Sequence, residues 1–314
     1  MDLGSTSFRL VVAEADREGR IVPLVRKRAR LELGLVVGRE GRIPKLDGAA
    51  AVEAVTKFRR QAERAGAERI VTVATSALRD AANRKKLARR LEAAAGEPVR
   101  FLSGEEEAAL TFTAMRAGLG IGKVEVLGAD LGGGSLELAV GNRDRIEWTT
   151  SLDLGASRLA GRFLAGAPMT SASRTCLTDH VEGVLRPLAS DPSRSWPSRC
   201  VASGGTVKAI ARIAAAPWSA ASPSLHGLTL GAKELVAVCE RIISVSRRTL
   251  RRMPGADPNR AHLLGSGALV VASLVTFLGL AEVTVSTWGL REGIIFEALG
   301  LAVADPGHDL DLSA

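Results

Sequence analysis

The chain has 314 residues, of which 46% are apolar and 24% charged, the composition of a soluble globular protein long enough for two lobes of roughly 100–200 residues each. It contains neither an apolar run of the ~18 residues needed to span a bilayer nor a basic-then-apolar leader, which predicts a cytoplasmic protein without a membrane partner. Three widely spaced cysteines and four scattered histidines argue against a disulfide framework and a zinc site.

The net charge of +8 is locally concentrated in Arg26–Arg30 ("RKRAR") and Asn83–Glu92 ("NRKKLARRLE"). The simpler interpretation is a solvated helix face, and the alternative is an electrostatic funnel for a polyanion. Tyrosine is absent and aromatic residues make up 4% of the chain, which argues against a base-stacking platform. Nucleic acid is therefore an unfavoured partner.

Hydrophobic periodicity predicts alternating strands and helices along the chain. In the first half, strands are expected at 8–15, 21–33, 69–77 and 98–104, and helices at 49–66, 78–96 and 105–119. In the second half, strands are expected at 123–130, 135–140, 146–155 and 281–287, a strand–glycine–helix unit at 199–213, and helices at 260–279 and 289–300. The segment 164–198, rich in Ser, Pro and Arg, is assigned only as helix plus loop.

One pattern, D-L-G-x-x-S followed by an alternating apolar run, occurs twice, starting at Asp2 and at Asp130. Two copies of one strand-rich α/β unit imply two similar lobes with a cleft between them, where ligands commonly bind. We expect a first lobe at 1–120 and a second at 121–288, with a hinge near 119–123. A helix at 289–302 is expected to pack back on the first lobe, and 303–314 to form a flexible tail.

The glycine-rich turns are candidate phosphate sites, because glycines let backbone amides converge on an anion. The groups that can hold a phosphate in the second turn are Gly132, Gly133, Gly134 and Ser135. Asp130 repels phosphate, so a divalent cation is expected between them, with Glu137 as a second acid and Mg²⁺ as the natural cation. A third candidate turn opens a helix and consists of Ser203, Gly204, Gly205 and Thr206. The alternative for each turn is a tight hairpin whose aspartate binds loop amides; no P-loop or dinucleotide fingerprint occurs at these turns.

Six motifs together resemble the exopolyphosphatase/guanosine pentaphosphate phosphohydrolase (Ppx/GppA) family, in a short form. They are "DLGSTSFRLVV", "VATSALRDAAN", "FLSGEEEAAL", "GADLGGGSLELAVG", "ASGGT" and "GLREG". The resemblance covers nearly the whole chain in order. It implies an α/β fold of two ribonuclease-H-like lobes, as in the actin/Hsp70/sugar-kinase superfamily, and hydrolysis of a terminal phosphoanhydride of polyphosphate or of the 5′ γ-phosphate of pppGpp.

The resemblance also assigns roles to residues. Glu107, in "SGEEEA", matches the catalytic glutamate, and Arg79 matches an arginine that acts on phosphate. Asp130 and Glu137 match the acids associated with the cation. The first-turn residues expected at the phosphate are Ser5, Thr6 and Ser7. From the residues alone, the acids at 105–107 could equally stabilise a helix dipole, and Arg79 could pair with Asp80 or face solvent.

The sequence departs from the family pattern at several positions. Thr6 replaces the usual Asn, which loses an amide donor; Arg9 stands where many relatives have His, and Ala109 replaces a basic residue. Most of the strand expected before Asp2 is missing, which leaves two alternatives: a start upstream of Met1, or a first lobe with an incomplete edge.

Three functional hypotheses follow from these patterns. The leading one is a Mg²⁺-dependent phosphohydrolase whose partner is a polyanionic phosphate substrate. The others are an ATP-dependent kinase of the same superfamily and a non-catalytic sensor of polyphosphate or guanosine polyphosphates. The choice between polyphosphate and pppGpp, the preferred chain length, processivity and the oligomeric state, with a homodimer among the options, stay open at this point. The motifs "GLREG" and "RAHLLGSGA" are expected only to cap helices and pack the lobes.

Overall fold

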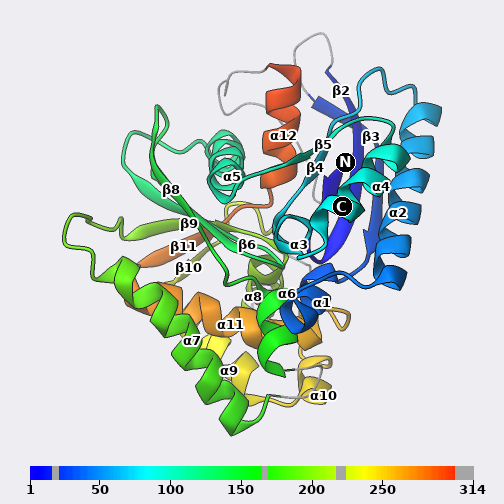
Figure 1. The fold of residues 1–314 in the computed structure, drawn as a ribbon. Coiled ribbons are helices and arrows are strands. Elements are labelled where there is room, and N and C mark those ends of the chain that lie inside the picture. The colour runs from blue at the N-terminus through cyan, green and yellow to red at the C-terminus, as the bar shows by residue number, and fades with distance from the viewer. Residues whose placement is uncertain (16–20, 165–168, 217–223, 301–314) are drawn as a thin grey trace.

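A computed structural model describes residues 1–15, 21–164, 169–216 and 224–300, which form two α/β lobes lying side by side (Figure 1). The tail expected at 303–314 lies outside the described residues. Within the described ranges, no helix is both long enough and apolar enough to cross a membrane.

The first lobe contains a five-stranded sheet in the order β3-β2-β1-β4-β5. Its strands are β1 (Asp2–Leu3), β2 (Ser7–Ala15), β3 (Ile21–Arg30), β4 (Thr72–Ala74) and β5 (Val99–Phe101). The first three pair antiparallel, and β4 and β5 continue the sheet in parallel. The short β1 is therefore at the centre of the sheet, between β2 and β4, and not at its edge.

The second lobe repeats this order with one strand added. Its sheet runs β8-β7-β6-β9-β11-β10. The strands are β6 (Val126–Leu131), β7 (Leu136–Gly141), β8 (Ile146–Leu152), β9 (Arg199–Ser203), β10 (Thr229–Gly231) and β11 (Glu282–Val285). Strands β6 to β8 pair antiparallel, β9 and β11 follow in parallel, and β10 pairs antiparallel at the edge. The repeated order follows from the repeated sequence unit.

Helices cover both sheets. On the first sheet, α2 (Lys45–Arg64) and α4 (Arg84–Ala95) bury an apolar face, for example Phe58 and Leu91. The second sheet packs against helices that include α7 (Ser171–Ala189), α8 (Gly205–Ala215), α9 (Ala232–Ser244) and α11 (Ala261–Phe277). Smaller elements are α6 (Ala156–Leu159), the π-helix η1 (Ala160–Leu164) and α10 (Arg247–Leu250).

Two helices lie between the sheets (Figure 1). The helix α5 (Gly104–Leu119) packs Phe112 against Val126 and Ala139 of the second sheet. The C-terminal helix α12 (Leu290–Leu299) places Ile294 against Val73 of the first sheet and also packs on α5. These contacts fix the start of α5 at the junction of the lobes.

The structure differs from the predicted elements in several places, and α9 and β10 are among the elements that the sequence did not predict. The single helix expected at 78–96 is split into α3 (Ser76–Asp80) and α4, because Ala81 is extended and the Asn83 side chain binds the backbone of Ile43. A helix that periodicity did not predict, α1 (Leu33–Glu40), packs against α6 and η1 of the second lobe. Within 164–198, α7 ends at Ala189 and the following residues form a loop.

Candidate active site

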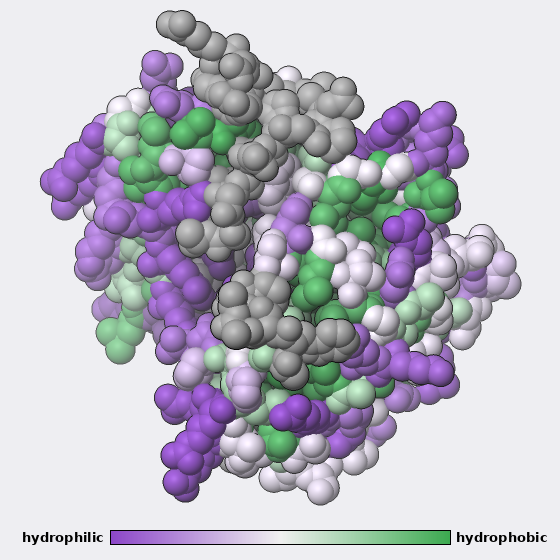
Figure 2. Space-filling view, turned by 180° about the vertical axis from the view of Figure 1, so that it is seen from behind, coloured by the Kyte–Doolittle hydropathy of each residue, from purple (hydrophilic) through white to green (hydrophobic). Residues whose placement is uncertain are grey.

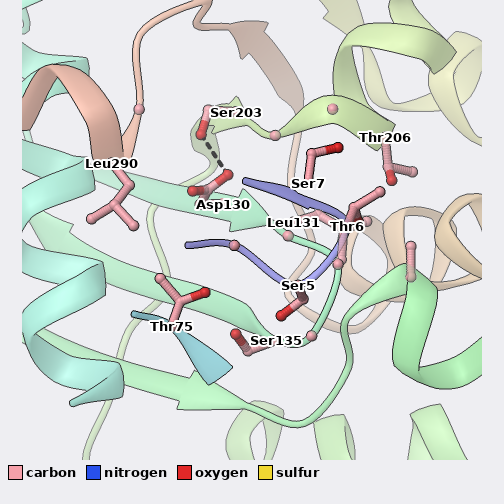
Figure 3. Close-up of a pocket in the computed structure, with 18 of the residues that line it drawn as sticks. Ser5, Thr6, Ser7, Thr75, Asp130, Leu131, Ser135, Ser203, Thr206 and Leu290 are labelled. Carbon is pink, nitrogen blue, oxygen red and sulfur yellow. Dashed lines mark hydrogen bonds between the residues drawn. The ribbon is translucent and has the colours of Figure 1, made fainter. Parts of the chain in front are cut away.

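A polar cavity of about 150 Å³ lies between the lobes, where the two repeated turns meet. A cavity needs about 10–15 Å³ to hold one water, so this cavity has room for a phosphoryl group and ordered water. Figure 3 shows the first-turn side chains beside Leu131 and Ser135 of the second turn. The predicted residues in the lining are Ser5, Thr6, Ser7, Glu107, Asp130, Gly132, Gly133, Gly134, Ser135, Glu137, Ser203, Gly204, Gly205 and Thr206.

The two turns lie face to face. Thr6 Oγ1 is 2.9 Å from Ser157 Oγ across the lobe boundary, and a Cβ on Gly133 would sit only 2.2 Å from Thr6 Oγ1. Ser5 Oγ accepts the Ala77 amide at 3.1 Å. A side chain at Gly133 would therefore force the turns apart, which explains glycine at that position. The Thr6 hydroxyl bonds to Ser157, so it joins the lobes in addition to lining the cavity.

The carbonyl groups of the three glycines in the second turn are all bound by residues of α6. The carbonyls of Gly132 and Gly133 accept from the amides of Ala156 and Arg158, at 3.1 and 2.9 Å. The carbonyl of Gly134 accepts from Arg158 Nε at 2.7 Å. Because trans peptide units are planar, carbonyls turned toward α6 leave the next three N–H groups pointing away from those bonds. The glycines of this turn line the cavity, and backbone amides of such a turn are groups that can bind phosphate oxygens.

The third turn lies beside Asp130. Gly204 has φ of +101°, a conformation that favours glycine, and a Cβ there would sit 2.2 Å from the Leu131 carbonyl oxygen. Ser203 Oγ donates to Asp130 Oδ1 at 2.7 Å (Figure 3). The sharp turn thus lets α8 begin against the second glycine turn, with its first amides next to the cavity.

Asp130 and Glu137 are direct cross-strand partners in the β6–β7 ladder. Opposite residues of an antiparallel pair lie on one face with Cβ atoms about 4.5–5.5 Å apart. Ser151 Oγ donates to Glu137 Oε1 at 2.8 Å. Two carboxyl groups thus face the cavity together. This pairing is unusual, because like charges directly opposite each other in a strand ladder repel.

The donor set at the turns fits the expected cation in one binding mode. Among the described residues, no group of three or more His, Cys, Asp or Glu side chains is arranged to hold a metal alone. Mg²⁺ commonly binds through one or two carboxylates and takes its other ligands from substrate phosphates and water. The Asp130–Glu137 pair beside the glycine turn fits that mode, and it does not fit a cage made only of protein ligands.

Glu107 does not share the role of the two acids before it. Glu106 forms a capping box with Ser103, with bonds of 2.7 and 3.1 Å, and Glu105 is exposed. Glu107 is only 5% exposed and lines the cavity. The helix-dipole interpretation therefore fits Glu105 and Glu106, whereas Glu107 is buried against the cavity.

Arg79 lies behind Glu107, and the structure does not bring it into the cavity lining. Its Nη1 donates to Glu107 Oε1 at 2.6 Å and to the Leu102 carbonyl at 2.7 Å, while its Nε contacts Asp80 at 3.2 Å. Asp80 in turn binds Arg158 of the second lobe. In this arrangement Arg79 holds the Glu107 carboxylate. Arg79 does not line the cavity, so it is not placed for the phosphate contact that the family pattern predicted.

The acids of the cavity hold their protons unusually well. Desolvation, followed by the charge of Glu137, raises the pKa of Glu107, while Arg79 opposes the shift. Desolvation and the charge of Asp130 raise the pKa of Glu137. Desolvation also raises the pKa of Asp130, against the Ser203 hydrogen bond. A cation placed among these carboxylates would stabilise their charged forms.

Sequence reasoning placed Arg9 near the cleft but missed the other cations of the cavity wall. The cavity lining also includes Asp2, Arg9, Lys208, Arg260, Arg291 and Glu292. Desolvation lowers the pKa of Lys208 to about 8 and those of Arg9 and Arg260 to about 10. Arg260 and Arg291 come from the two motifs expected only to cap and pack. Gly289 and Glu292 do form a capping bond of 2.7 Å, but the same segment supplies a cation to the cavity.

The repeated strand order, the paired turns at the lobe interface and the likeness to a solved structure confirm the predicted α/β fold of two similar lobes. The family model of the Ppx/GppA phosphatase family matches residues 11–302. The chain therefore belongs to the Ppx/GppA phosphatase family, a family of phosphohydrolases.

Its relatives and structural neighbours agree with this assignment. Exopolyphosphatase 1 of Mycobacterium tuberculosis is 32% identical over 302 residues, which cover 95% of this chain and 87% of that protein. Exopolyphosphatase 2 of the same species is 29% identical over 316 residues, with 96% and 98% coverage. The crystal structure of an exopolyphosphatase from Cytophaga hutchinsonii has a TM-score of 0.85 at 23% identity, covering 97% of this chain and 98% of that one. A Ppx/GppA family member from Aquifex aeolicus has a TM-score of 0.76 at 23% identity, with 95% of both chains covered.

Proposed function

We propose that this protein is an exopolyphosphatase, which hydrolyses the terminal phosphoanhydride bond of inorganic polyphosphate. The observation that supports this most directly is the placement of Glu107, which is buried, bonded to Arg79 at 2.6 Å, and lines the same cavity as the glycine turn of the second lobe. Relatives that cover almost the whole chain are named exopolyphosphatases. Cleavage of the 5′ γ-phosphate of pppGpp requires the same chemistry, so pppGpp is the second candidate substrate.

In the proposed reaction, the amides of the second turn and the Ser135 hydroxyl hold the terminal phosphoryl group. Glu107 orients a water in line with the bond to be broken and accepts its proton, and Arg79 keeps the carboxylate directed into the cavity. The water oxygen forms the new P–O bond, and the shortened chain leaves with the bridging oxygen. The cationic residues Arg9, Lys208 and Arg260 stabilise the charge on the departing phosphates.

Asp130 and Glu137 are the residues that would hold magnesium in this proposal. When bound, the ion would neutralise phosphoryl oxygens in the transition state. Ser203 holds one oxygen of Asp130, and Ser151 holds one oxygen of Glu137, so both carboxylates are fixed before a ligand arrives.

A substrate panel tests the proposal. Orthophosphate release is measured from short polyphosphate, long polyphosphate, pppGpp and ATP, each with Mg²⁺ and with EDTA. We expect magnesium-dependent release from polyphosphate without any acceptor. Transfer to an added acceptor, dependent on ATP, would favour a kinase. Tight binding of polyphosphate with no release would favour a sensor.

A further inference from the structure

A row of charged residues crosses the first sheet from the cavity to its outer edge. In the strand registers, Asp2 of β1 faces Arg9 of β2, and Arg9 faces Arg28 of β3. Asp2 and Arg9 line the cavity, whereas Arg28 lies one strand further out, about 4.8 Å along the sheet. The row therefore leads out of the cavity on the cationic side.

The Arg9–Arg28 pair is unfavourable in the absence of a ligand. Like charges directly opposite each other in an antiparallel ladder repel. In the described part of the chain, no carboxylate lies within ion-pair distance of Arg28, whose Nε donates to Ser7 Oγ at 3.0 Å. Desolvation, followed by the charge of Arg30, lowers the pKa of Arg28, and Asp257 is the acid that most counteracts this shift. Asp257 also pairs with Arg260, at 3.7 Å.

Arg28 is an exposed residue. Ser7, which Arg28 contacts, lines the cavity, so the side chain is at the cavity rim. Arg30, the next residue on this face, is already engaged by Glu32 at 2.8 Å and by the Asn259 carbonyl of the second lobe. Seen from behind, hydrophilic side chains gather along the edge of the molecule formed by the first lobe (Figure 2). The segment Arg26–Arg30 is therefore part of strand β3 and not a helix face. Because side chains alternate along a strand, Arg26, Arg28 and Arg30 lie on the same face of the sheet as Arg9.

We propose that Arg28 forms an outer phosphate subsite, which binds a phosphate group of a chain whose end occupies the cavity. This inference rests on the proposed function. A phosphate between Arg9 and Arg28 would accept hydrogen bonds from both guanidinium groups and relieve their repulsion. Arg28 therefore selects for substrates with enough linked phosphates to reach from the cavity to β3. It takes no part in the bond cleavage.

The matched pair of variants is Arg28→Gln and Lys27→Gln. Lys27 is exposed, carries the same charge and is adjacent in sequence, but its register partner Leu10 belongs to the core, so it lies on the opposite face of the strand. Initial rates of phosphate release are measured for tripolyphosphate and for long-chain polyphosphate. Melting temperatures are measured without ligand and with long-chain polyphosphate.

For Arg28→Gln we expect a KM for long-chain polyphosphate raised about fivefold, with kcat nearly unchanged. The KM for tripolyphosphate and all constants of Lys27→Gln should stay within about twofold of the parent protein. The ligand-free melting temperature should not fall, because a like-charge contact has been removed. An equal loss on both substrates, or equal behaviour of the two variants, would overturn the subsite. Absence of phosphate release from every substrate by the parent protein would instead overturn the proposed function.

Discussion

Glu107→Gln tests the centre of the proposed mechanism, because it keeps the shape of the side chain and removes its ability to accept a proton. The amide oxygen can still accept from Arg79 Nη1, which lies 2.6 Å from the carboxylate oxygen. Loss of a positioned general base typically lowers kcat by about 10²–10⁴-fold. We expect a decrease in this range with little change in polyphosphate binding, measured by steady-state phosphate release and by a binding titration.

The same variant should be more stable than the parent protein at pH 8 without ligand. Desolvation and Glu137 raise the folded-state pKa of Glu107 above its unfolded value. The stability that this group provides is therefore full below the unfolded pKa and is lost as the pH rises through the folded pKa. Between the unfolded and the folded pKa, each pH unit lowers the unfolding free energy of the parent protein by about 1.4 kcal/mol. At the roughly 2–4 °C per kcal/mol found for domains of 150–250 residues, each such unit corresponds to a gain of about 3–6 °C for the variant, and the gain vanishes near pH 4.

The control is Glu105→Gln, in the same helical turn but exposed. It should keep near-normal activity and show no gain in melting temperature at pH 8. The reasoning is refuted if Glu107→Gln retains more than half of the parent kcat, or if it melts well below the parent protein at pH 8. The first result would place the base elsewhere; the second would make Glu107 a structural ion-pair partner of Arg79.

Three further predictions concern the turns and the lobe junction. Asp130→Asn keeps an acceptor for Ser203 but loses the charge, so the magnesium concentration for half-maximal activity should rise at least about tenfold; an unchanged titration would remove Asp130 from the metal site. Gly204→Ala, with φ of +101°, should lower the unfolding free energy by about 1–3 kcal/mol in a denaturant titration, whereas Gly183→Ala, with open space around it, should not. Arg158→Gln should lower kcat about tenfold, because it releases the Gly134 carbonyl. Adding Asp80→Asn should lower kcat little further, since both substitutions break the same Arg158–Asp80 ion pair. Fully additive effects in the double-mutant cycle would contradict this coupling.

Much of the fold could be predicted from the sequence because each lobe begins with the same local pattern. The turns at Asp2 and Asp130 predicted two similar units, and the five strands of the first sheet have the same order as five of the six strands of the second. The helix α1 was missed because Gly34 and Gly38 interrupt its pattern, and these glycines are there for close contact: a Cβ on Gly38 would sit 2.3 Å from the Arg158 carbonyl oxygen. Packing between distant segments explains a residue choice that helix propensity does not.

The site shows a similar division. Residues next to a glycine turn, such as Ser135 and Glu137, could be found because the turn marks them. Arg260 and Arg291 could not, since each enters the cavity from a helix start more than 100 residues away from the second turn. Arg79 shows the opposite limit, because its motif was recognised but its contact with Glu107 depends on the three-dimensional placement of α3 against α5.

The distribution of charge in the cavity leads to a last prediction, on how two ligands affect each other. Desolvation disfavours the charged forms of Glu107, Asp130 and Glu137, which a bound cation would stabilise. Desolvation also disfavours the charged forms of Arg9 and Lys208, which a bound anion would stabilise. A phosphate chain brings negative charge toward the carboxylates, and a divalent ion removes that repulsion, so each ligand should strengthen binding of the other by the same factor. In Glu107→Gln, which turns over slowly, the shift in melting temperature with magnesium and polyphosphate together should exceed the sum of the separate shifts. Simple additivity would mean that the two ligands occupy independent sites, and the carboxylate pair would then have no part in holding a phosphate–cation cluster.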